Sequence, residues 1–141
     1  MKRKILFAVV LFIGLLGFIS CNDTNDLNSV SAIKNIEGNW NCVLDEGDGT
    51  TEYYKVTITA DPNNANGIII SNFFNNGASA HATVNQLHID LPKQQLGDYT
   101  VEGSGNISSD YQRIEWDYTV DGSAVHATFT PGGVAKKAPI L

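Results

Sequence analysis

Few residues in this 141-residue chain have the chemistry and spacing that catalysis requires. Glu115 and Asp117 are two positions apart, which places both carboxylates on one face of an extended strand. Paired carboxylates hydrolyse glycosides when they flank a substrate cleft, but neighbours on one outward strand face do not form a cleft. The sequence also lacks a glycine-rich phosphate loop and a nucleophile elbow. We therefore predict that the chain is not an enzyme.

Metal-ligating residues are also dispersed. His81, His88 and His126 fall on three different predicted strands, whereas a metal site needs three or four converging ligands. Residues 45–52 are rich in carboxylates and could attract calcium, but they lack the alternating ligand spacing of an EF-hand loop. A hydrated hairpin turn is the expected structure there, and no metal or cofactor is predicted.

Aromatic residues at polar positions are better candidates for binding. Tyr53, Tyr111 and one of the pair Phe73 and Phe74 should lie on the outside of the domain or at its rim. Aromatic faces beside Asn and Asp suit sugar rings or protein contacts. We therefore take Tyr53, Phe73, Phe74 and Tyr111 as candidate ligand-binding residues, for a small hydrophobic molecule, a glycan or an envelope protein.

The elements that must position these residues are strands, because apolar and polar residues alternate from residue 38 onward. Gly, Asn and Asp clusters separate the alternating runs and predict turns. This pattern predicts one all-β domain, residues 36–130, in which about eight antiparallel strands form a meander that closes into a barrel or a sandwich. The predicted strands cover residues 38–45, 51–60, 67–74, 79–85, 87–91, 98–107, 113–121 and 124–130.

The side chains predicted to point inward are mostly large, which favours a core filled by the protein itself, with at most a shallow pocket near one mouth. Cys42 alternates with Trp40 and Leu44 and should be a buried, unreactive thiol. The run Ile68–Ile70 offers an apolar residue to either face, so the register that decides between Phe73 and Phe74 stays open. The inward set is Trp40, Leu44, Tyr54, Val56, Ile58, Leu87, Ile89, Tyr99, Val101, Ile114, Trp116, Tyr118 and Phe129.

The N-terminus has the layout of a secretory signal peptide. Three basic residues, Lys2 to Lys4, precede fifteen uncharged and mostly apolar residues, 5–19, and the run stops at Ser20-Cys21. A small residue directly before a cysteine at this point resembles the lipobox of bacterial lipoproteins, although Phe18 replaces the usual leucine. The resemblance implies that residues 1–20 are removed and that Cys21 carries diacylglycerol and palmitate.

Two alternatives to the lipoprotein interpretation stay open, an uncleaved short anchor and ordinary signal cleavage near Ser20. Residues 22–35 are polar and show no periodicity, so residues 21–35 are predicted to be a lipidated cysteine followed by a flexible tether. Residues 131–141 are predicted to be a tail that frays or caps the open end of the domain.

Net charge restricts the partners. Loss of residues 1–20 removes three basic residues and no acidic one, so the net charge changes from −6 to −9. An acidic protein is poorly suited to nucleic acid, whose affinity comes mainly from Lys and Arg contacting phosphates. It is equally unsuited to lie on an anionic membrane, so membrane attachment is predicted to depend on the lipid.

Gly38-Asn39-Trp40, at the start of the first predicted strand, resembles the Gly-x-Trp signature of lipocalins. The runs 99–107 and 114–120 look like those of small lipocalin-like (calycin-type) lipoproteins of Bacteroides-group bacteria, and the resemblance spans residues 36–130. It implies an up-and-down β-barrel of about eight strands anchored to the outer membrane, in which Gly38 and Trp40 are structural. The chain is shorter than ligand-carrying lipocalins and lacks their paired cysteines.

Together these observations predict a lipid-anchored cell-envelope protein with a lipocalin-like barrel that binds a small ligand or a partner at the barrel rim. The alternative is a protein-interaction or inhibitor module of the outer membrane.

Overall fold

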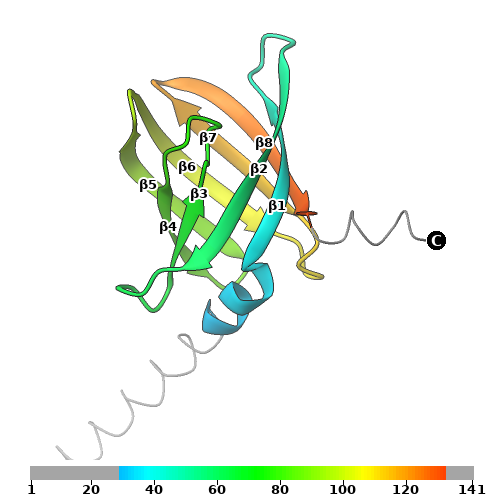
Figure 1. Ribbon diagram of the computed structural model, residues 1–141, viewed down its shortest axis with the longest axis vertical. Coiled ribbons are helices and arrows are strands. Elements are labelled where there is room, and N and C mark those ends of the chain that lie inside the picture. Colours follow the sequence, from blue (N-terminus) through cyan, green and yellow to red (C-terminus); the bar gives the residue numbers. More distant parts are fainter. Residues whose placement is uncertain (1–28, 133–141) are drawn as a thin grey trace, which may run out of the picture.

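The computed structural model describes residues 29–132, which form a closed barrel of eight antiparallel strands and one short helix (Figure 1). Each strand pairs with the next along the chain, and β8 returns to pair with β1 through Cys42 and Phe129. The predicted up-and-down β-barrel is thus confirmed, whereas the signal peptide lies outside the described residues. The strands are β1 (Gly38–Asp45), β2 (Thr51–Ala60), β3 (Gly67–Ser71), β4 (Ala80–Asn85), β5 (His88–Leu96), β6 (Tyr99–Ile107), β7 (Ile114–Val120) and β8 (Ser123–Pro131).

Two strands differ in length from the prediction by more than two residues. β3 ends at Ser71 and not at residue 74, because the chain turns at Asn72, whose φ is 62°. β5 continues to Leu96, whereas the predicted strand ended at residue 91. The ladder with β6 shifts register between Leu91 and Gln94, and this irregularity accommodates a proline within the strand.

The side chains that alternate inward form a single core. Ile68 and Ile70 point inward and are fully buried, while Ile69 faces outward, which settles the register left open by the sequence. Leu87 and Tyr99 were predicted to be inward but are 37% and 40% exposed. Leu87 lies in the turn between β4 and β5, and Tyr99 is the first residue of β6, so both are at the margin of the barrel wall. The largest fully buried side chains are Trp116, Phe73, Phe129, Ile36, Leu44, Ile58, Ile68, Ile70, Ile89, Leu91, Leu96 and Ile114.

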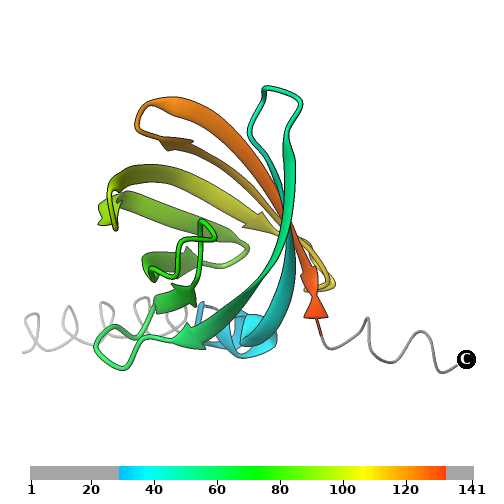
Figure 2. The same ribbon diagram turned by 45° about the horizontal axis from the view of Figure 1, so that its top comes forward.

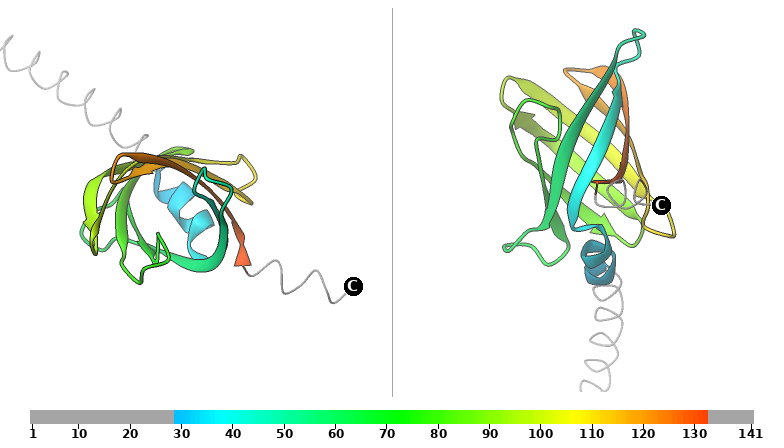
Figure 3. Two further views of the ribbon diagram at one scale, coloured as in Figure 1. Left: turned by 90° about the horizontal axis from the view of Figure 1, so that it is seen from above. Right: turned by 45° about the vertical axis from the view of Figure 1, so that its right-hand side comes forward.

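Residues 29–36 form a helix across one end of the barrel (Figures 1 and 3). Ala32, Ile33 and Ile36 are at most 3% exposed, so they follow the helical spacing of i, i+1 and i+4 and face the core. The prediction of a flexible tether reaching residue 35 is therefore wrong for residues 29–35. A helix this short depends on packing for its stability, and this burial supplies it. Within the described residues, no helix has the length and apolar character needed to cross a membrane.

The barrel wall is not uniform. β1 and β2 pair along all of Gly38–Asp45, and the β6–β7 and β7–β8 ladders are also long. By contrast, β3 pairs only with residues 57–60 of β2, and β5 pairs only with residues 83–85 of β4. The wall between β2 and β5, at the end away from the helix, is completed by the β3–β4 connection, residues 72–79, and not by a strand (Figure 2).

Candidate binding site at the open end of the barrel

The end of the barrel opposite the helix has an aromatic rim. The rings of Phe74 and Tyr99 meet edge to face with centroids 5.3 Å apart, and Phe74 also lies 6.4 Å from Tyr118. Phe74 is half-buried and Tyr99 is 40% exposed, so both rings present a face to solvent. Tyr99 follows the β5–β6 turn, whereas Phe74 belongs to the 72–79 segment. Two elements distant in sequence therefore form this rim.

Phe73, unlike the half-buried Phe74, lies wholly in the interior of the barrel. It is 1% exposed, and its ring lies 5.1 Å from Trp116, 4.9 Å from Tyr118 and 6.2 Å from Phe129. Trp116 and Phe129 are in turn 5.4 Å apart. Such edge-to-face and tilted contacts are the favoured geometries of aromatic rings. Four rings thus fill the middle of the barrel, and one of them is contributed by a loop.

Polar atoms lie beside this aromatic cluster, inside the upper half of the barrel. The Tyr54 hydroxyl donates a hydrogen bond of 2.7 Å to the Phe73 carbonyl oxygen. Burial raises the pKa of the Cys42 thiol to about 11, and burial also raises the pKa values of Tyr54 and Tyr118. All three groups are therefore neutral at physiological pH, and Cys42 is a buried free thiol, as predicted.

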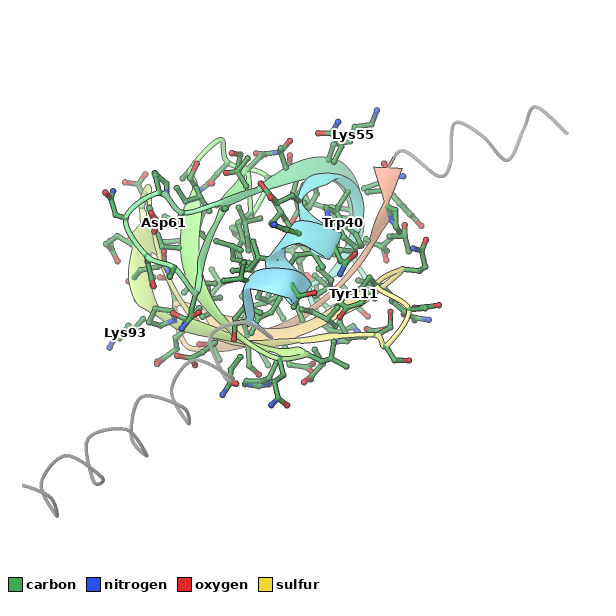
Figure 4. All side chains as sticks on the ribbon, turned by 90° about the horizontal axis from the view of Figure 1, so that it is seen from below. Trp40, Lys55, Asp61, Lys93 and Tyr111 are labelled. Carbon is green, nitrogen blue, oxygen red and sulfur yellow. The ribbon has the colours of Figure 1, made fainter. Side chains whose placement is uncertain are left out.

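The four candidate ligand-binding residues do not form one site. Tyr53 lies on the outer face of β2, 77% exposed, and Phe74 lies at the open rim, whereas Phe73 is buried in the core. Tyr111 is half-buried at the other end of the barrel, beside the helix (Figure 4). There it lines a shallow hollow of about 310 Å³ together with Ala32 and Leu87.

The end that holds Tyr111 is closed by packing. The Trp40 indole N–H donates a hydrogen bond of 2.8 Å to the carbonyl oxygen of Ile36, the last residue of the helix. Trp40 is 3% exposed and lies beside the helix, while Lys55, Asp61 and Lys93 lie around the outer margin in this view (Figure 4). Gly38 has a φ of 128°, a conformation that residues with a Cβ rarely adopt. Gly38 and Trp40 are thus placed where they join the helix to the barrel.

A network of charged side chains lies on the outer face of β7 and β8. His126 bridges two carboxylates, with Nδ1 2.8 Å from Asp117 Oδ1 and Nε2 2.9 Å from Glu115 Oε2. Glu115 is also paired with Arg113 and accepts a hydrogen bond of 3.1 Å from Thr128 Oγ1. The hydrogen bond to Asp117, opposed by partial burial and reinforced by both negative charges, raises the pKa of His126. The network thus links β7 to β8 through side chains on the outer face of the barrel.

A concavity of about 570 Å³ lies beside that network, between the β1–β2 turn and strands β6 to β8. Asp117 and His126 line it, so one of the two carboxylates of the sequence pair does border a hollow, contrary to our expectation. Glu115 is not among its lining residues, so the sequence pair is not brought together there, but Asp45 and Glu102 line the hollow together with Asp117.

The remaining histidines are separate from one another. His88 Nδ1 lies 3.2 Å from Asn106 Oδ1, and His81 lies 3.7 Å from Asp61. Within residues 29–132 we find no cluster of three or more His, Cys, Asp or Glu side chains that could hold a metal ion. In the β1–β2 turn, Asp45 and Asp48 accept backbone hydrogen bonds from Gly47 and Thr50, each of 2.9 Å. Their carboxylates therefore stabilise the turn itself.

Sequence reasoning missed two features of the site. The role of Tyr54 depends on the Phe73 carbonyl, nineteen residues away, and no local pattern reports such a contact. The 72–79 segment was predicted to be partly strand because Phe73 and Phe74 are apolar. The Asn and Gly residues of this segment could have indicated a turn, because Asn72, Asn75 and Gly77 all adopt positive φ.

Comparisons with known proteins bear on the fold. No protein-family model matches the sequence, and no curated protein matches it. Among solved structures, a redesigned β-barrel, b11L5F_LGL, is 17% identical with a TM-score of 0.57, over 70% of this chain and 93% of that one. A second redesigned β-barrel, mFAP1, bound to DFHBI, is 23% identical with a TM-score of 0.50, over 70% of this chain and 97% of that one. At these identities the likeness shows that this chain shares a β-barrel fold with them.

Proposed function

We propose that this chain is a lipid-anchored, non-enzymatic protein of the cell envelope, most simply of the outer membrane, that binds a small hydrophobic or glycan ligand at the open rim of its barrel. The observation that carries the proposal is the difference between the two barrel ends. One end is closed by the N-terminal helix, and the other has an aromatic rim formed by Phe74 and Tyr99.

The position of the proposed lipid supports this arrangement. Seven residues lie between Cys21 and Ser29, the first described residue, and a fully extended chain would span at most roughly 28 Å from one to the other. The helix then enters the barrel at its closed end. A lipid on Cys21 would hold the closed end near the membrane and leave the aromatic rim free to meet a ligand. The lipobox and the lipocalin-like Gly38-Asn39-Trp40 motif are consistent with this assignment.

The barrel architecture is compatible with ligand binding. The redesigned barrel mFAP1, which shares the fold, is bound to DFHBI. In the present chain, the exposed faces of Phe74 and Tyr99 suit stacking against an apolar molecule or a sugar ring. The acidic residues of the chain favour neutral or cationic ligands over anionic ones.

Lipid attachment is tested by feeding cells an alkyne-labelled palmitate and recovering the full chain. We expect label on the native protein and none on Cys21→Ser, while Cys42→Ser stays labelled because Cys42 is buried in the barrel. Equal labelling of the native protein and Cys21→Ser would refute the anchor.

Rim binding is tested by thermal-shift screening of the full chain with glycans, lipids and small hydrophobic molecules. A compound that binds the rim should stabilise the native protein but not Phe74→Ala. Tyr111→Ala is the matched control, because Tyr111 is also a half-buried aromatic residue but lies at the closed end. If Tyr111→Ala alone lost the thermal shift, the ligand would bind at the end closed by the helix, which would contradict binding at the rim.

A second candidate, a protein-interaction or inhibitor module, is favoured by the free edge of β2. Among the described residues, the ladder between β2 and β3 begins only at Thr57, so Thr51 to Tyr53 have no strand partner on that side. Tyr53 is 77% exposed at this edge, opposite Val43, which is 37% exposed. An exposed edge with apolar side chains can accept an added strand from another protein.

The two proposed functions predict different results when the full chain is used in pull-downs from membranes. An interaction module predicts a stoichiometric protein partner in pull-downs of the full chain, and Tyr53→Lys should abolish its recovery. Tyr111→Lys should leave recovery unchanged. Ligand binding at the rim requires no such partner.

A further inference from the structure

Phe73 occupies a position in the barrel that a small ligand could also occupy. Its ring is enclosed by Trp116, Tyr118 and Phe129, at centroid distances of 4.9 to 6.2 Å. The enclosing rings belong to β7 and β8, whereas Phe73 belongs to the 72–79 segment. The walls of this position therefore do not depend on the residue that fills it.

One of these walls carries a hydrogen-bond donor that Phe73 cannot satisfy. Trp116 Nε1 is buried and has no hydrogen-bond partner among the described residues, whereas the Tyr118 hydroxyl lies beside that of Tyr54. Trp116 is fully buried and Tyr118 is 4% exposed. Buried polar groups in folded proteins are almost always hydrogen-bonded, so each exception calls for a reason. A phenyl ring offers no acceptor oxygen, whereas a ligand in its place could offer one.

The 72–79 segment is attached in a way that permits it to move. It folds on itself, because the side chain of Asn72 accepts a hydrogen bond from Gly77 N and that of Asn76 accepts one from Ala78 N. Its links to the neighbouring strands run through side chains: Tyr54 to the Phe73 carbonyl, Asn72 Nδ2 to Lys55 O at 3.0 Å, and Asn76 Nδ2 to Leu96 O at 2.8 Å. Such bonds can break singly without disrupting a backbone ladder, and water can replace them.

The surroundings restrict the charge of a ligand. Among the described residues, Lys34, Lys55, Lys93 and Arg113 are all exposed, so no cation lies within the core to pair with an anion. Glu46 and Glu52 lie close enough to Tyr118 to raise its pKa further. A buried anion without a partner is strongly disfavoured.

We propose that residues 72–79 form a lateral gate, and that displacement of Phe73 opens an interior site for a neutral aromatic molecule bearing an acceptor oxygen. The acceptor takes the hydrogen bond of Trp116 Nε1, and the ring takes the place of the Phe73 ring. This inference rests on the proposed ligand binding at the open end and specifies where the ligand goes and what it is.

The two tryptophans of the chain make a direct test possible. The Trp40 indole N–H is already bonded to Ile36 O, whereas that of Trp116 has no partner in the described structure. We would label the full chain with 15N-tryptophan in detergent micelles and titrate it with acetophenone, a neutral aromatic ketone. Ethylbenzene, which has nearly the same shape but no acceptor, is the matched probe.

Acetophenone should move the Trp116 indole proton downfield, as expected for a new hydrogen bond, and leave that of Trp40 in place. Ethylbenzene should bind more weakly and cause no downfield shift. Equal responses to both probes would overturn the proposed ligand class, because the donor would then play no part.

The gate is tested by Tyr54→Phe, which removes only the hydroxyl bonded to Phe73 O. Loss of one neutral hydrogen bond from the closed state should raise the apparent affinity for acetophenone about fivefold. Tyr53→Phe, the same change on the exposed neighbour, should have no effect. Equal affinity in the native protein, Tyr54→Phe and Tyr53→Phe would refute gating by this bond.

Phe73→Ala should raise the affinity more than tenfold, because the site is then vacant. If Phe73→Ala keeps the native Trp40 resonance but acetophenone does not shift Trp116, the interior site is refuted. If Phe73→Ala does not fold, the Tyr54→Phe comparison decides the matter alone. A ligand whose thermal shift needs Phe74 but which leaves Trp116 unchanged would refute the interior site while preserving the proposed rim function.

Discussion

The two ends of this barrel are closed by different physical means. At the helical end, Ile33 and Ile36 are buried, and the Trp40 indole joins the helix to β1. At the opposite end, the 72–79 segment completes the wall through side-chain hydrogen bonds and places Phe73 in the core. The first closure combines apolar burial with a hydrogen bond buried from water. The second combines burial of the Phe73 ring with side-chain hydrogen bonds that are only partly buried.

This difference shows how a small barrel can be both stable and open to binding. Long ladders from β6 through β8 to β1 and β2 hold most of the wall, so the short strands β3 and β4 need not carry it. Local opening is cheapest where buried apolar contacts and backbone ladders are fewest. Changes at the helical end should therefore reduce stability, whereas changes at the 72–79 segment should alter binding.

The largest expected effect is at the helical end. Ile36 is fully buried, so Ile36→Ala should lower the free energy of unfolding by about 2–5 kcal/mol, from lost burial and the cavity left behind. Urea denaturation measures this change. Lys34→Ala, on the exposed side of the same helix, is the control and should change it little. Equal and small effects of the two substitutions would mean that the helix does not close the barrel.

The second prediction compares the solid wall with the 72–79 segment. A Cβ added at Gly103 would lie 2.4 Å from both Asp117 O and Tyr118 Cα, which are backbone atoms and cannot move aside. Gly103→Ala should therefore cost about 1–3 kcal/mol of stability or more. Asn76→Ala removes the bond to Leu96 O and the exposed bond from Ala78 N, and should cost about 1 kcal/mol. A greater loss for Asn76→Ala in thermal unfolding would reverse our ranking of the two walls.

The third prediction uses the two tryptophans as a matched pair. Trp40→Phe breaks the hydrogen bond to Ile36 O and leaves a buried carbonyl unpaired, whereas Trp116→Phe removes a donor that has no partner in the described structure. Both substitutions remove the same volume. We expect Trp40→Phe to cost about 1 kcal/mol more than Trp116→Phe in chemical denaturation. The opposite order would show that the Trp116 donor is satisfied.

The sequence predicted the strands well where one face is apolar and the other polar. β1 and β2 have the predicted bounds because alternation leaves a single register that buries Trp40, Cys42 and Leu44. The helix was missed because Ala32, Ile33 and Ile36 give one short apolar stripe among polar residues. Such a stripe becomes helical only when the end of a barrel is there to cover it.

The candidate site was harder to predict than the fold. Its aromatic residues were identified from the sequence, but their grouping was not. Phe73 and Tyr111 turned out to lie in different parts of the barrel, because a loop places the first and a closed end places the second. Contacts such as Tyr54 with Phe73 depend on the three-dimensional path of a loop, which alternation along strands does not specify.

The smallest expected effect concerns pH and the outer face of the ladder between β7 and β8. The hydrogen bond to Asp117, with help from Glu115, raises the pKa of His126 above its ordinary value of 6.5. Because the pKa of His126 is higher in the folded state than in the unfolded state, its contribution to the free energy of unfolding is fully present below pH 6.5. The contribution is lost as the pH rises through the folded-state pKa. His126 is about half exposed, so solvent screening keeps the contribution below about 1 kcal/mol.

This contribution is measured as the difference in unfolding free energy between the native protein and His126→Gln, followed across pH. We expect the difference to be largest at the acidic end of the range, provided the carboxylates stay ionised, and to shrink toward alkaline pH. His88→Gln is the control, because His88 faces the neutral amide of Asn106 and not a carboxylate. A pH-independent difference for His126→Gln would mean that the imidazole holds β7 and β8 together as a neutral group, without the charge that its two carboxylate partners favour.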